Sequence, residues 1–344
     1  MDTTAQTPVD TNVQPAVTPQ RIMQMAWGFA LPLAIQSAVT NHIFDTLAGG
    51  GKTPEEIAAA TGVAMRGLPF LLNILTEAGL LKAEGERYAL TAESERFLVS
   101  SSPAFHGVFF AHVHDLIEHW LALPEAIRTG VSTIQVNEQS GGAEFFESFV
   151  EAIFPTSYPA AQTLARALRL GEVQDEFRVV DLGAGSGVWG IAAAQASPRV
   201  HVTAVDWPNV LNVTRRVAAR MGVAEQFDFL AGNLRDVALP GGTDLITIGH
   251  ILHSEGERHS RSLLERCYAA LKPGGRIAIQ EFLLNDDRRG PMQPLMFGLN
   301  MLVHTTEGSV WSAAEIGGWL RDAGFTDVEL LPAPGPSPLI LARK

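Results

Sequence analysis

The pattern of apolar and polar positions divides the chain into two parts. From residue 177 onward, short apolar runs alternate with segments of helical length, which predicts βαβ units and a parallel sheet. The last two runs are joined by a proline-rich stretch too short for a helical crossover, so we expect them to pair antiparallel. The expected strands are 177–182, 201–206, 227–231, 244–249, 276–283, 327–331 and 339–342.

The first part of the chain has the periodicity of helices, followed by a short hairpin. Residues 54–60 follow Thr53, and Glu56 stands at the third helical position, which is the pattern of a capping box. A second helix is expected over 67–78, and residues 79–91 have the alternation of two short strands around a turn. Helix, turn, helix and hairpin together predict a winged helix.

The 344 residues are enough for two domains, and the change of pattern places their boundary near residue 170. Residues 1–18 lack periodicity and are expected to form a disordered tail. We expect a mainly helical, winged-helix domain over 19–170. A Rossmann-like α/β domain is expected over 171–344, its sheet mostly parallel with an antiparallel last pair.

One long segment near the N-terminus is uncharged. From Ile22 to Phe44 no residue carries a full charge, a length that could span a bilayer. The segment also contains polar side chains, including Gln24, Gln36 and Asn41, that hydrocarbon would leave unsatisfied. We therefore expect no membrane span but helices buried at a subunit interface, that is, a homodimer.

Charge disfavours several classes of partner. With 25 basic and 37 acidic residues the net charge is −12, which repels phosphate backbones and anionic membranes. The second helix of the winged helix offers only Arg66 for DNA readout, so we expect no nucleic acid; a ligand-sensing or DNA-binding regulator is the less favoured alternative. The single cysteine, Cys267, suits a reducing compartment, so the expected location is the cytoplasm.

A glycine-rich loop, DLGAGSG at 181–187, follows the first strand of the sheet domain and leads into a helix. Gly183 and Gly185 let the backbone approach a ligand closely. Asp206 ends the next strand, 19 residues after Gly187, where an acid can accept hydrogen bonds from both hydroxyls of a ribose. A nucleotide-containing cofactor is therefore expected at this loop.

The loop alone does not decide between two cofactors, because residues 185–190 also fit the GxGxxG pattern of dinucleotide-binding dehydrogenases. The tight GxGxG directly after a strand-end Asp, together with the antiparallel closing pair, favours S-adenosylmethionine over NAD. Asn233 and Leu234, at the end of the third strand, could bond and pack against adenine. Asn233 could equally be a turn residue.

An acid/base pair is expected at the same edge. His253 follows the fourth strand and Glu281 ends the fifth, and ligands of open parallel sheets bind beyond the carboxyl ends of the strands. Neighbouring strands lie about 5 Å apart, so the carboxylate could hold one ring nitrogen of His253 and leave the other to take a proton from a phenol. Alternatively, His253 could cap the following helix and Glu281 could pair with an arginine.

His250 and His253 also form H-x-x-H, but a metal site would need the fold to gather further ligands, and there is no Cys cluster, so no metal is expected. The other histidines considered as metal ligands are His112, His114, His119 and His304.

From about residue 20 to its end, the chain resembles the S-adenosylmethionine-dependent small-molecule O-methyltransferases with an N-terminal dimerisation domain. The resemblance implies that His253 is the base and Glu281 orients it, that the wing is structural, and that the N-terminal helices intertwine two subunits. The implied cofactor contacts are Gly183, Asp206, Asn233 and Leu234, with Tyr158 and Trp207 as weaker candidates. The matching segments are 38–47, 53–62, 87–91, 181–187, 252–253, 271–275, 281 and 322–325.

The chain departs from the family pattern around the base. Many members have Lys-Trp four and three residues before the histidine and Asp-Trp after it, whereas this chain has GH at 249–250 and SE at 254–255. The lysine contact with the cofactor is therefore absent, and His250 could replace the ring. A second family glutamate corresponds to Val310, and Glu307 is the nearest acid, so its role stays open.

The sequence thus predicts transfer of a methyl group from S-adenosylmethionine to a hydroxyl of a small aromatic, polyketide-like natural product. Methylation of carbon on a similar aromatic or enol substrate is the alternative. The expected substrate-pocket residues are Phe109, His112, Trp120, Phe149, Met296, Phe297, Asn300 and Met301.

Overall fold

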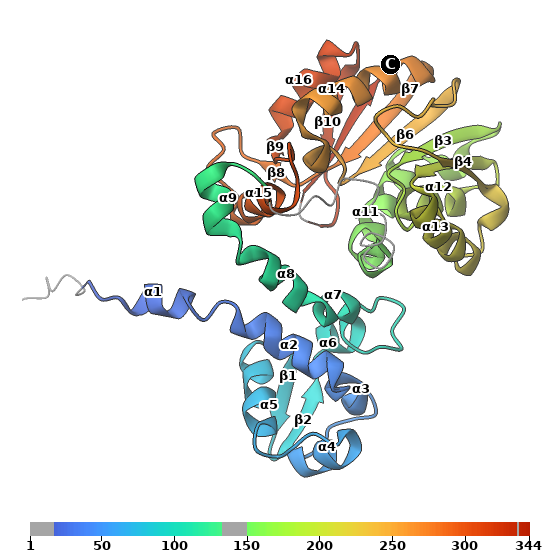
Figure 1. The fold of residues 1–344 in the computed structure, drawn as a ribbon. Coiled ribbons are helices and arrows are strands. Elements are labelled where there is room, and N and C mark those ends of the chain that lie inside the picture. The colour runs from blue at the N-terminus through green and yellow to red at the C-terminus, as the bar shows by residue number, and fades with distance from the viewer. Residues whose placement is uncertain (1–16, 133–149, 336) are drawn as a thin grey trace, which may run out of the picture.

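The computed structural model describes residues 17–132, 150–335 and 337–344. It has an N-terminal helical domain with a small hairpin and a larger domain built on a seven-stranded sheet (Figure 1). Three short helices run between the two domains: α7 (Gly107–Ala111), α8 (Val113–Trp120) and α9 (Leu123–Thr129). The disordered tail expected over 1–18 lies almost wholly outside the described residues.

The sheet of the larger domain has the strand order β10-β11-β7-β6-β3-β4-β5. The neighbours from β7 to β5 run parallel, and β11 pairs antiparallel with both β7 and β10. The prediction of a mostly parallel sheet with an antiparallel last pair is therefore confirmed. The strands are β3 (Phe177–Leu182), β4 (Val200–Asp206), β5 (Phe227–Ala231), β6 (Thr243–Gly249), β7 (Leu271–Gln280), β10 (Thr326–Leu331) and β11 (Leu339–Arg343).

The strand expected over 276–283 was wrong at both ends. β7 already begins at Leu271 and stops at Gln280. Beyond it, Leu283 and Leu284 form β8, which pairs with β9 (Trp311–Ser312) in a separate small sheet. The Ser337 hydroxyl accepts the Leu283 N–H at 3.1 Å and helps to hold this departure. Glu281 consequently lies just past the end of the strand, free to turn into the site.

Helices cover both faces of the sheet, because successive strand residues point to opposite sides. Val179 belongs to one buried cluster and Val180 to the other. The first face is covered by α11 (Phe154–Ala167), α12 (Val188–Ala196) and α13 (Pro208–Arg220), and the second by α14 (Leu252–Ala270) and α16 (Ala313–Asp322). The remaining elements are the helix α15 (Met292–His304) and the 3-10 turns η1 (Leu170–Glu172) and η2 (Ala224–Gln226).

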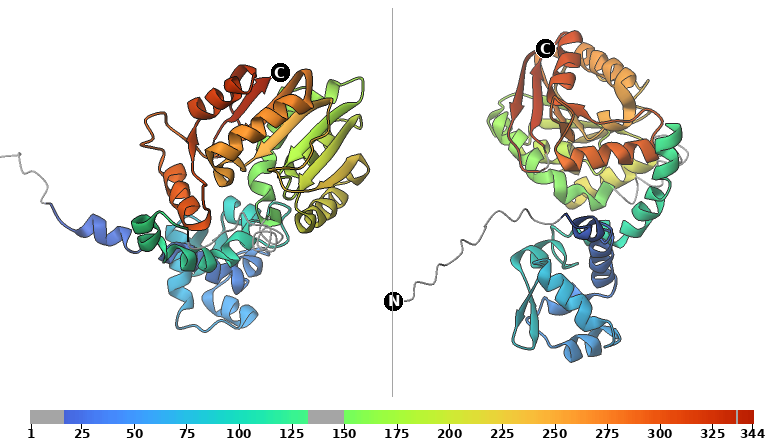
Figure 2. Two further views of the ribbon diagram at one scale, coloured as in Figure 1. Left: turned by 45° about the horizontal axis from the view of Figure 1, so that its top comes forward. Right: turned by 90° about the vertical axis from the view of Figure 1, so that its left-hand side faces the viewer.

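Helix α11 precedes the expected domain boundary at residue 170 but packs with the sheet domain. Its buried residues Phe154, Ala161 and Leu164 share one core cluster with Val179 and Ile191. In the sheet domain α11 lies mainly against α12, and Figure 2 shows it in light green with this domain. The core of the sheet domain therefore starts earlier in the chain than the change of sequence pattern suggested.

The N-terminal domain is a winged helix, as predicted. Its capping box is formed as expected: the Thr53 side chain accepts the Glu56 N–H, and the Glu56 carboxylate accepts the Thr53 N–H at 2.9 Å. Arg87 of the hairpin then binds both carboxylate oxygens of Glu56 at 3.0 Å. The elements are α2 (Ala30–Thr40), α3 (Ile43–Leu47), α4 (Pro54–Thr61), α5 (Leu68–Glu77), β1 (Leu81–Glu84), β2 (Arg87–Leu90) and α6 (Ala92–Phe97).

The first half of the uncharged N-terminal segment is exposed in the single chain, whereas Ala38, Ile43 and Phe44 in its second half are buried. Helix α1 (Gln20–Met25) reaches away from the domain (Figure 1). The stretch Gln20–Thr40 is long and apolar enough to cross a membrane, yet only 11% of its most apolar 18-residue window, with a mean hydropathy of 1.3, is buried within the chain. Its exposed side chains include Met25, Trp27 and Phe29. An exposed apolar surface of this kind is typical of a protein–protein interface, which agrees with the predicted burial of these helices between two subunits.

Candidate active site

The expected site residues lie along one edge of the sheet. The carboxyl ends of β3, β4, β6 and β7 bring the glycine loop, Asp206, His250 and Glu281 to this edge. This is where open α/β sheets bind their ligands.

The glycine loop turns sharply between β3 and α12. Gly183 and Gly187 both have left-handed φ values, +62° and +79°, which glycine adopts without strain. A Cβ at Gly183 would also collide with the side chain of Ile251, and one at Gly187 with that of Thr214. The Thr214 hydroxyl donates to the Gly185 carbonyl at 2.7 Å and fixes the loop from α13. Glycine is therefore required here by both conformation and space.

Asp206 joins the loop to the end of β4. Its carboxylate accepts the N–H of Gly185 at 2.8 Å and that of Trp207 at 2.7 Å. Burial raises the pKa of Asp206 to about 6, although both hydrogen bonds act to lower it. A half-buried carboxylate beside a glycine loop fits the ribose of an adenosine cofactor.

A second aspartate, Asp181, has a supporting role that the sequence did not reveal. It is fully buried and accepts the N–H of Gly190 at 3.0 Å and the hydroxyl of Thr247 at 2.8 Å. Burial raises its pKa to about 7, against these two hydrogen bonds. The side chain thus ties α12 to β6 beneath the loop.

The segment after β5 is held in place by one arginine side chain. Arg266 of α14 donates to the carbonyls of Leu234 and Val237. The Asn233 side chain accepts the Arg235 N–H at 3.0 Å, which is the turn role considered for it, and the side chain is exposed. Leu234 packs next to Gly183. The structure therefore brings Leu234 and the Asn233 turn to the loop.

Of the two weaker cofactor candidates, only Trp207 lies at the site. It precedes α13 directly after Asp206. The hydroxyl of Tyr158 instead donates to Gln195 at 2.5 Å, and the Tyr158 ring stacks on Phe154 in the core. Gln195 lies in the last turn of α12, whereas the glycine loop begins that helix. The structure does not bring Tyr158 to the loop.

His253 and Glu281 form the expected pair. Nδ1 of His253 lies 2.7 Å from Glu281 Oε2, while Oε1 accepts the N–H of Leu252 at 2.6 Å and, more distantly, that of His253. The exposed fraction is 9% for His253 and 2% for Glu281. Glu281 therefore both orients the ring and caps the start of α14.

The charge balance at this pair favours an ionised carboxylate. Burial by itself would raise the pKa of Glu281, but His253, His250 and the Leu252 N–H together lower it below its ordinary value. Because the carboxylate only accepts, Nδ1 of His253 carries the proton, and a neutral ring then has its lone pair on Nε2. That nitrogen can accept a proton.

His250 lies beside the pair, with its ring 4.8 Å from the ring of Phe282 and 6.3 Å from that of His253. Burial lowers the pKa of His250 to about 4, outweighing the attraction of Glu281. A ring nitrogen of His250, one of His253 and an oxygen of Glu281 lie within 4.8 Å of one another. In the described part of the chain this is the one group close enough to hold a metal, and two of its members are already hydrogen-bonded to each other.

The other histidines considered as ligands have separate partners. His112 and His114 lie near Asp115, at 3.4 and 3.1 Å. His119 and His304 face each other, with Nδ1 of the first 3.0 Å from Nε2 of the second. Neither set includes His250 or His253.

The expected pocket residues divide into three groups. Phe297 of α15 contacts the His253 ring edge-on at 4.8 Å and Phe282 at 4.1 Å, so it lies at the site. Trp120 donates to Asn300 at 2.9 Å and joins α8 to α15. The third group makes no hydrogen bond or ring contact with His253 in the described part of the chain. Met301 is buried, Phe109 and Met296 are exposed, and the His112 ring lies 3.4 Å from the Asp115 carboxylate. Phe149 lies outside the described residues.

Two further points concern residues near the base. Phe282 was not expected at the site; its place directly after Glu281 was the available signal. Glu307, whose role was left open, pairs with His259 at 3.2 Å and with Arg258 at 3.7 Å on α14. The structure records no contact between its side chain and His253.

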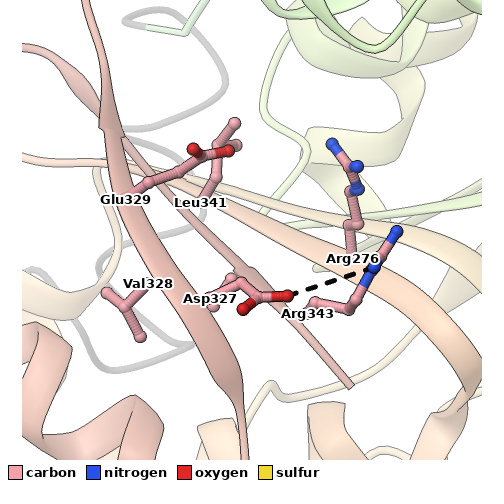
Figure 3. Close-up of a pocket in the computed structure, with 7 residues that line it drawn as sticks. Arg276, Asp327, Val328, Glu329, Leu341 and Arg343 are labelled. Atoms are coloured by element: carbon pink, nitrogen blue, oxygen red, sulfur yellow. Dashed lines mark ion pairs between the residues drawn. The ribbon is translucent and has the colours of Figure 1, made fainter.

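A hollow elsewhere on the sheet domain contains none of these residues. It lies between β7, β10 and β11, where Arg343 pairs with Asp327 at 4.0 Å and Arg276 lies nearby (Figure 3). Arg276 aligns with Leu245 near the amino end of β6, so the hollow lies away from the carboxyl ends of the strands and the glycine loop.

Fold and site together define a class: a Rossmann-like methyltransferase with an N-terminal winged helix. Comparison with known proteins agrees. Residues 125–326 match the O-methyltransferase domain, and residues 23–100 match the O-methyltransferase dimerisation domain. The chain belongs to this family and is an S-adenosylmethionine-dependent O-methyltransferase; the dimerisation domain supports a homodimer.

Individual relatives cover nearly the whole chain. It is 32% identical over 317 residues to a 3-hydroxy-5-methyl-1-naphthoate 3-O-methyltransferase of Streptomyces sahachiroi, covering 90% of each. It is also 32% identical over 335 residues to a tetracenomycin polyketide synthesis 8-O-methyl transferase of Streptomyces glaucescens, covering 95% of this chain and 97% of the relative. Human N-acetylserotonin methyltransferase, solved with S-adenosylmethionine, has a TM-score of 0.81 and 27% identity over 96% of this chain and 99% of that one.

Proposed function

We propose that His253 is the general base that would take the proton of an aromatic hydroxyl, so that the hydroxyl oxygen can accept the methyl group that S-adenosylmethionine supplies and S-adenosylhomocysteine is left. The observation that carries this proposal is the 2.7 Å contact between His253 Nδ1 and the buried Glu281, which leaves Nε2 as the acceptor. A phenol, with a pKa near 10, is mostly protonated at neutral pH, so a positioned imidazole can raise the rate about 10²- to 10⁴-fold.

The bound S-adenosylmethionine supplies a methyl group on positively charged sulfur. The residues proposed to hold it are Gly183, Gly185, Asp206, Trp207 and Leu234, with the turn at Asn233 closing the adenine side. Asp206 would accept ribose hydroxyls while the loop backbone follows the ligand. Phe297 and Phe282 form an apolar wall beside His253, which suits a flat aromatic substrate.

The substrate class we infer is a small aromatic, polyketide-like natural product. Two relatives that cover at least nine-tenths of the chain are named for a hydroxynaphthoate and for tetracenomycin polyketide synthesis, and the ring-lined site supports a similar acceptor. We also propose a cytoplasmic location, because the one cysteine, Cys267, is buried and unpaired. The net charge of −12 supports the absence of nucleic-acid partners.

The test replaces His253 by Ala and compares it with His259→Ala, a control on the same helix. We expect His253→Ala to lower kcat on a hydroxynaphthalene probe about 10²- to 10⁴-fold with cofactor affinity unchanged within about twofold by calorimetry. His259→Ala should retain full turnover. Unchanged turnover in His253→Ala would remove the base assignment. NMR of the product locates the methyl group. A methyl group on carbon would show that the enzyme methylates carbon, not oxygen, on this probe.

A further inference from the structure

The residue that follows β6, His250, has features that its neighbours in the site do not explain. Its φ is +59°, a backbone conformation uncommon for residues other than glycine. Its N–H donates to the Gln280 carbonyl at 2.8 Å, which holds it against the end of β7. Its ring lies on Phe282 at 4.8 Å. An unusual backbone that places a polar ring beside the catalytic pair points to a role in the site.

The two nitrogens of this ring have different surroundings. Nδ1 is enclosed and has no hydrogen-bond partner of regular geometry, and the same holds for Oε1 of Gln280. The Gln280 side chain acts to raise the pKa of His250, which is the direction expected of an acceptor that faces the ring. Its amide nitrogen points to the Ser337 carbonyl at 3.5 Å, which turns the amide oxygen to the other side. A carbonyl oxygen only accepts, so the ring proton belongs on Nδ1.

Nε2 is then the acceptor of the neutral ring; no hydrogen bond from the described residues reaches it, and it is not one of the enclosed atoms that lack a partner. A ring nitrogen of His250 lies within 4.8 Å of one of His253. The centroids of the two rings are 6.3 Å apart. Hydrogen bonds are about 2.7–3.2 Å long, so two imidazole rings this close can each contact one of two oxygens on neighbouring carbons of one substrate. The low pKa of His250 keeps the ring neutral, and therefore able to accept, throughout the neutral range.

We propose that His250 determines specificity by accepting a hydrogen bond from a second hydroxyl on the substrate, adjacent to the hydroxyl that His253 deprotonates. This inference rests on the proposed function of His253 and adds the substrate class: an aromatic ring with two neighbouring oxygens, the second of them a donor. A methoxy group in the second position offers no proton, so it would leave Nε2 without this bond.

The experiment uses three probes on one ring system: 2,3-dihydroxynaphthalene, 3-methoxy-2-naphthol and 2-naphthol. Dissociation constants are measured with the protein loaded with S-adenosylhomocysteine, and kcat/KM with S-adenosylmethionine. We expect the wild-type protein to prefer the diol over both other probes about 5- to 100-fold, beyond the factor of two from its two equivalent hydroxyls.

Two variants remove the acceptor in different ways. His250→Gly suits the positive φ and deletes the ring, whereas His250→Phe retains a ring against Phe282 but has no nitrogen. Both should reduce the preference for the diol to about twofold, and His259→Ala should retain it. His250→Phe places a bulky residue at a positive φ and is therefore strained. If His250→Phe does not bind the cofactor, the result for His250→Gly decides the test.

The proposal is wrong if the wild-type protein does not prefer the diol, whatever the absolute affinities. It is also wrong if the preference for the diol remains in His250→Gly. These outcomes are separate from the fate of the base assignment. His253→Ala lowers the turnover of every probe about 10²- to 10⁴-fold if His253 is the base, whereas the change in the ratio of dissociation constants between wild type and His250→Gly reports on His250.

Discussion

Two pairs of side chains built around histidine differ in what they can do with a proton. In one, His253 contacts the carboxylate of Glu281 at 2.7 Å, at the edge of the sheet. In the other, His119 of α8, one of the helices between the two domains, contacts His304 of α15 in the sheet domain at 3.0 Å. The contact lengths are similar, but one partner is an anion and the other is a neutral ring.

The neutral pair is a fixed chain of hydrogen bonds. Nδ1 of His304 lies 2.8 Å from the Asn300 carbonyl and so must donate, which makes Nε2 the acceptor for His119. Burial lowers the pKa of His304, and His119 lowers it further, although the bond to Asn300 acts the other way. Protonation would destroy the acceptor. This pair therefore joins α8 to α15, whereas in the proposed reaction the Glu281 carboxylate would stabilise a proton on His253.

The largest expected effect comes from Glu281. Glu281→Ala removes the charge that supports protonated His253 and leaves the Leu252 N–H without its acceptor, so kcat should fall about 10²-fold or more. His253→Ala combined with Glu281→Ala should be little worse than His253→Ala alone, because the two residues act as a unit. Additive losses in steady-state kinetics would contradict the pairing.

His119→Ala should act mainly on stability. It leaves Nε2 of buried His304 without a donor, which should lower the free energy of unfolding by about 1–2 kcal/mol in urea titrations. The kcat should fall less than tenfold, because His119 has no contact with His253 in the structure. A loss of kcat as large as that of Glu281→Ala would show that the two pairs do not have separate roles.

Trp120→Phe should have a smaller effect on the same helix contact. It retains most of the ring but removes the N–H that donates to Asn300 at 2.9 Å, so the expected loss is about 1 kcal/mol. A double-mutant cycle with His119→Ala measures whether the two contacts between α8 and α15 are coupled. Independent contacts give additive losses within about 0.5 kcal/mol.

The smallest expected effect is on the pH dependence of stability, where the two pairs should contribute over different pH ranges. Both Glu281 and His304 have pKa values below their ordinary ones, so in each case the unfolded chain binds more protons and stability rises with pH. The contribution of His304 is complete above about pH 6.5 and falls as pH drops through its folded pKa; that of Glu281 is complete above about pH 4.3. His304→Gln should weaken the dependence of the melting temperature on pH below about pH 6.5. Glu281→Gln should weaken it only below about pH 4.3.

Local sequence carried much of the fold and of the site. The capping box at Thr53 formed as expected, because its residues are three apart and need no distant partner. The glycine loop contacts Asp206 because the carboxyl ends of parallel strands lie at one edge of the sheet. For the same reason His253 lies next to Glu281. Periodicity, turn chemistry and strand ends are short-range properties, and a single sequence displays them.

The tertiary structure decided what lies across long separations. Trp120 and Asn300 were both expected to line a pocket, yet they bond to each other from positions 180 residues apart. Tyr158 was expected at the cofactor, but the packing of α11 on α12 gives its hydroxyl to Gln195. The partner of a side chain depends on how helices pack against the sheet, which no local pattern encodes; the sequence determined the chemistry at the strand ends, and packing determined which side chains reach it.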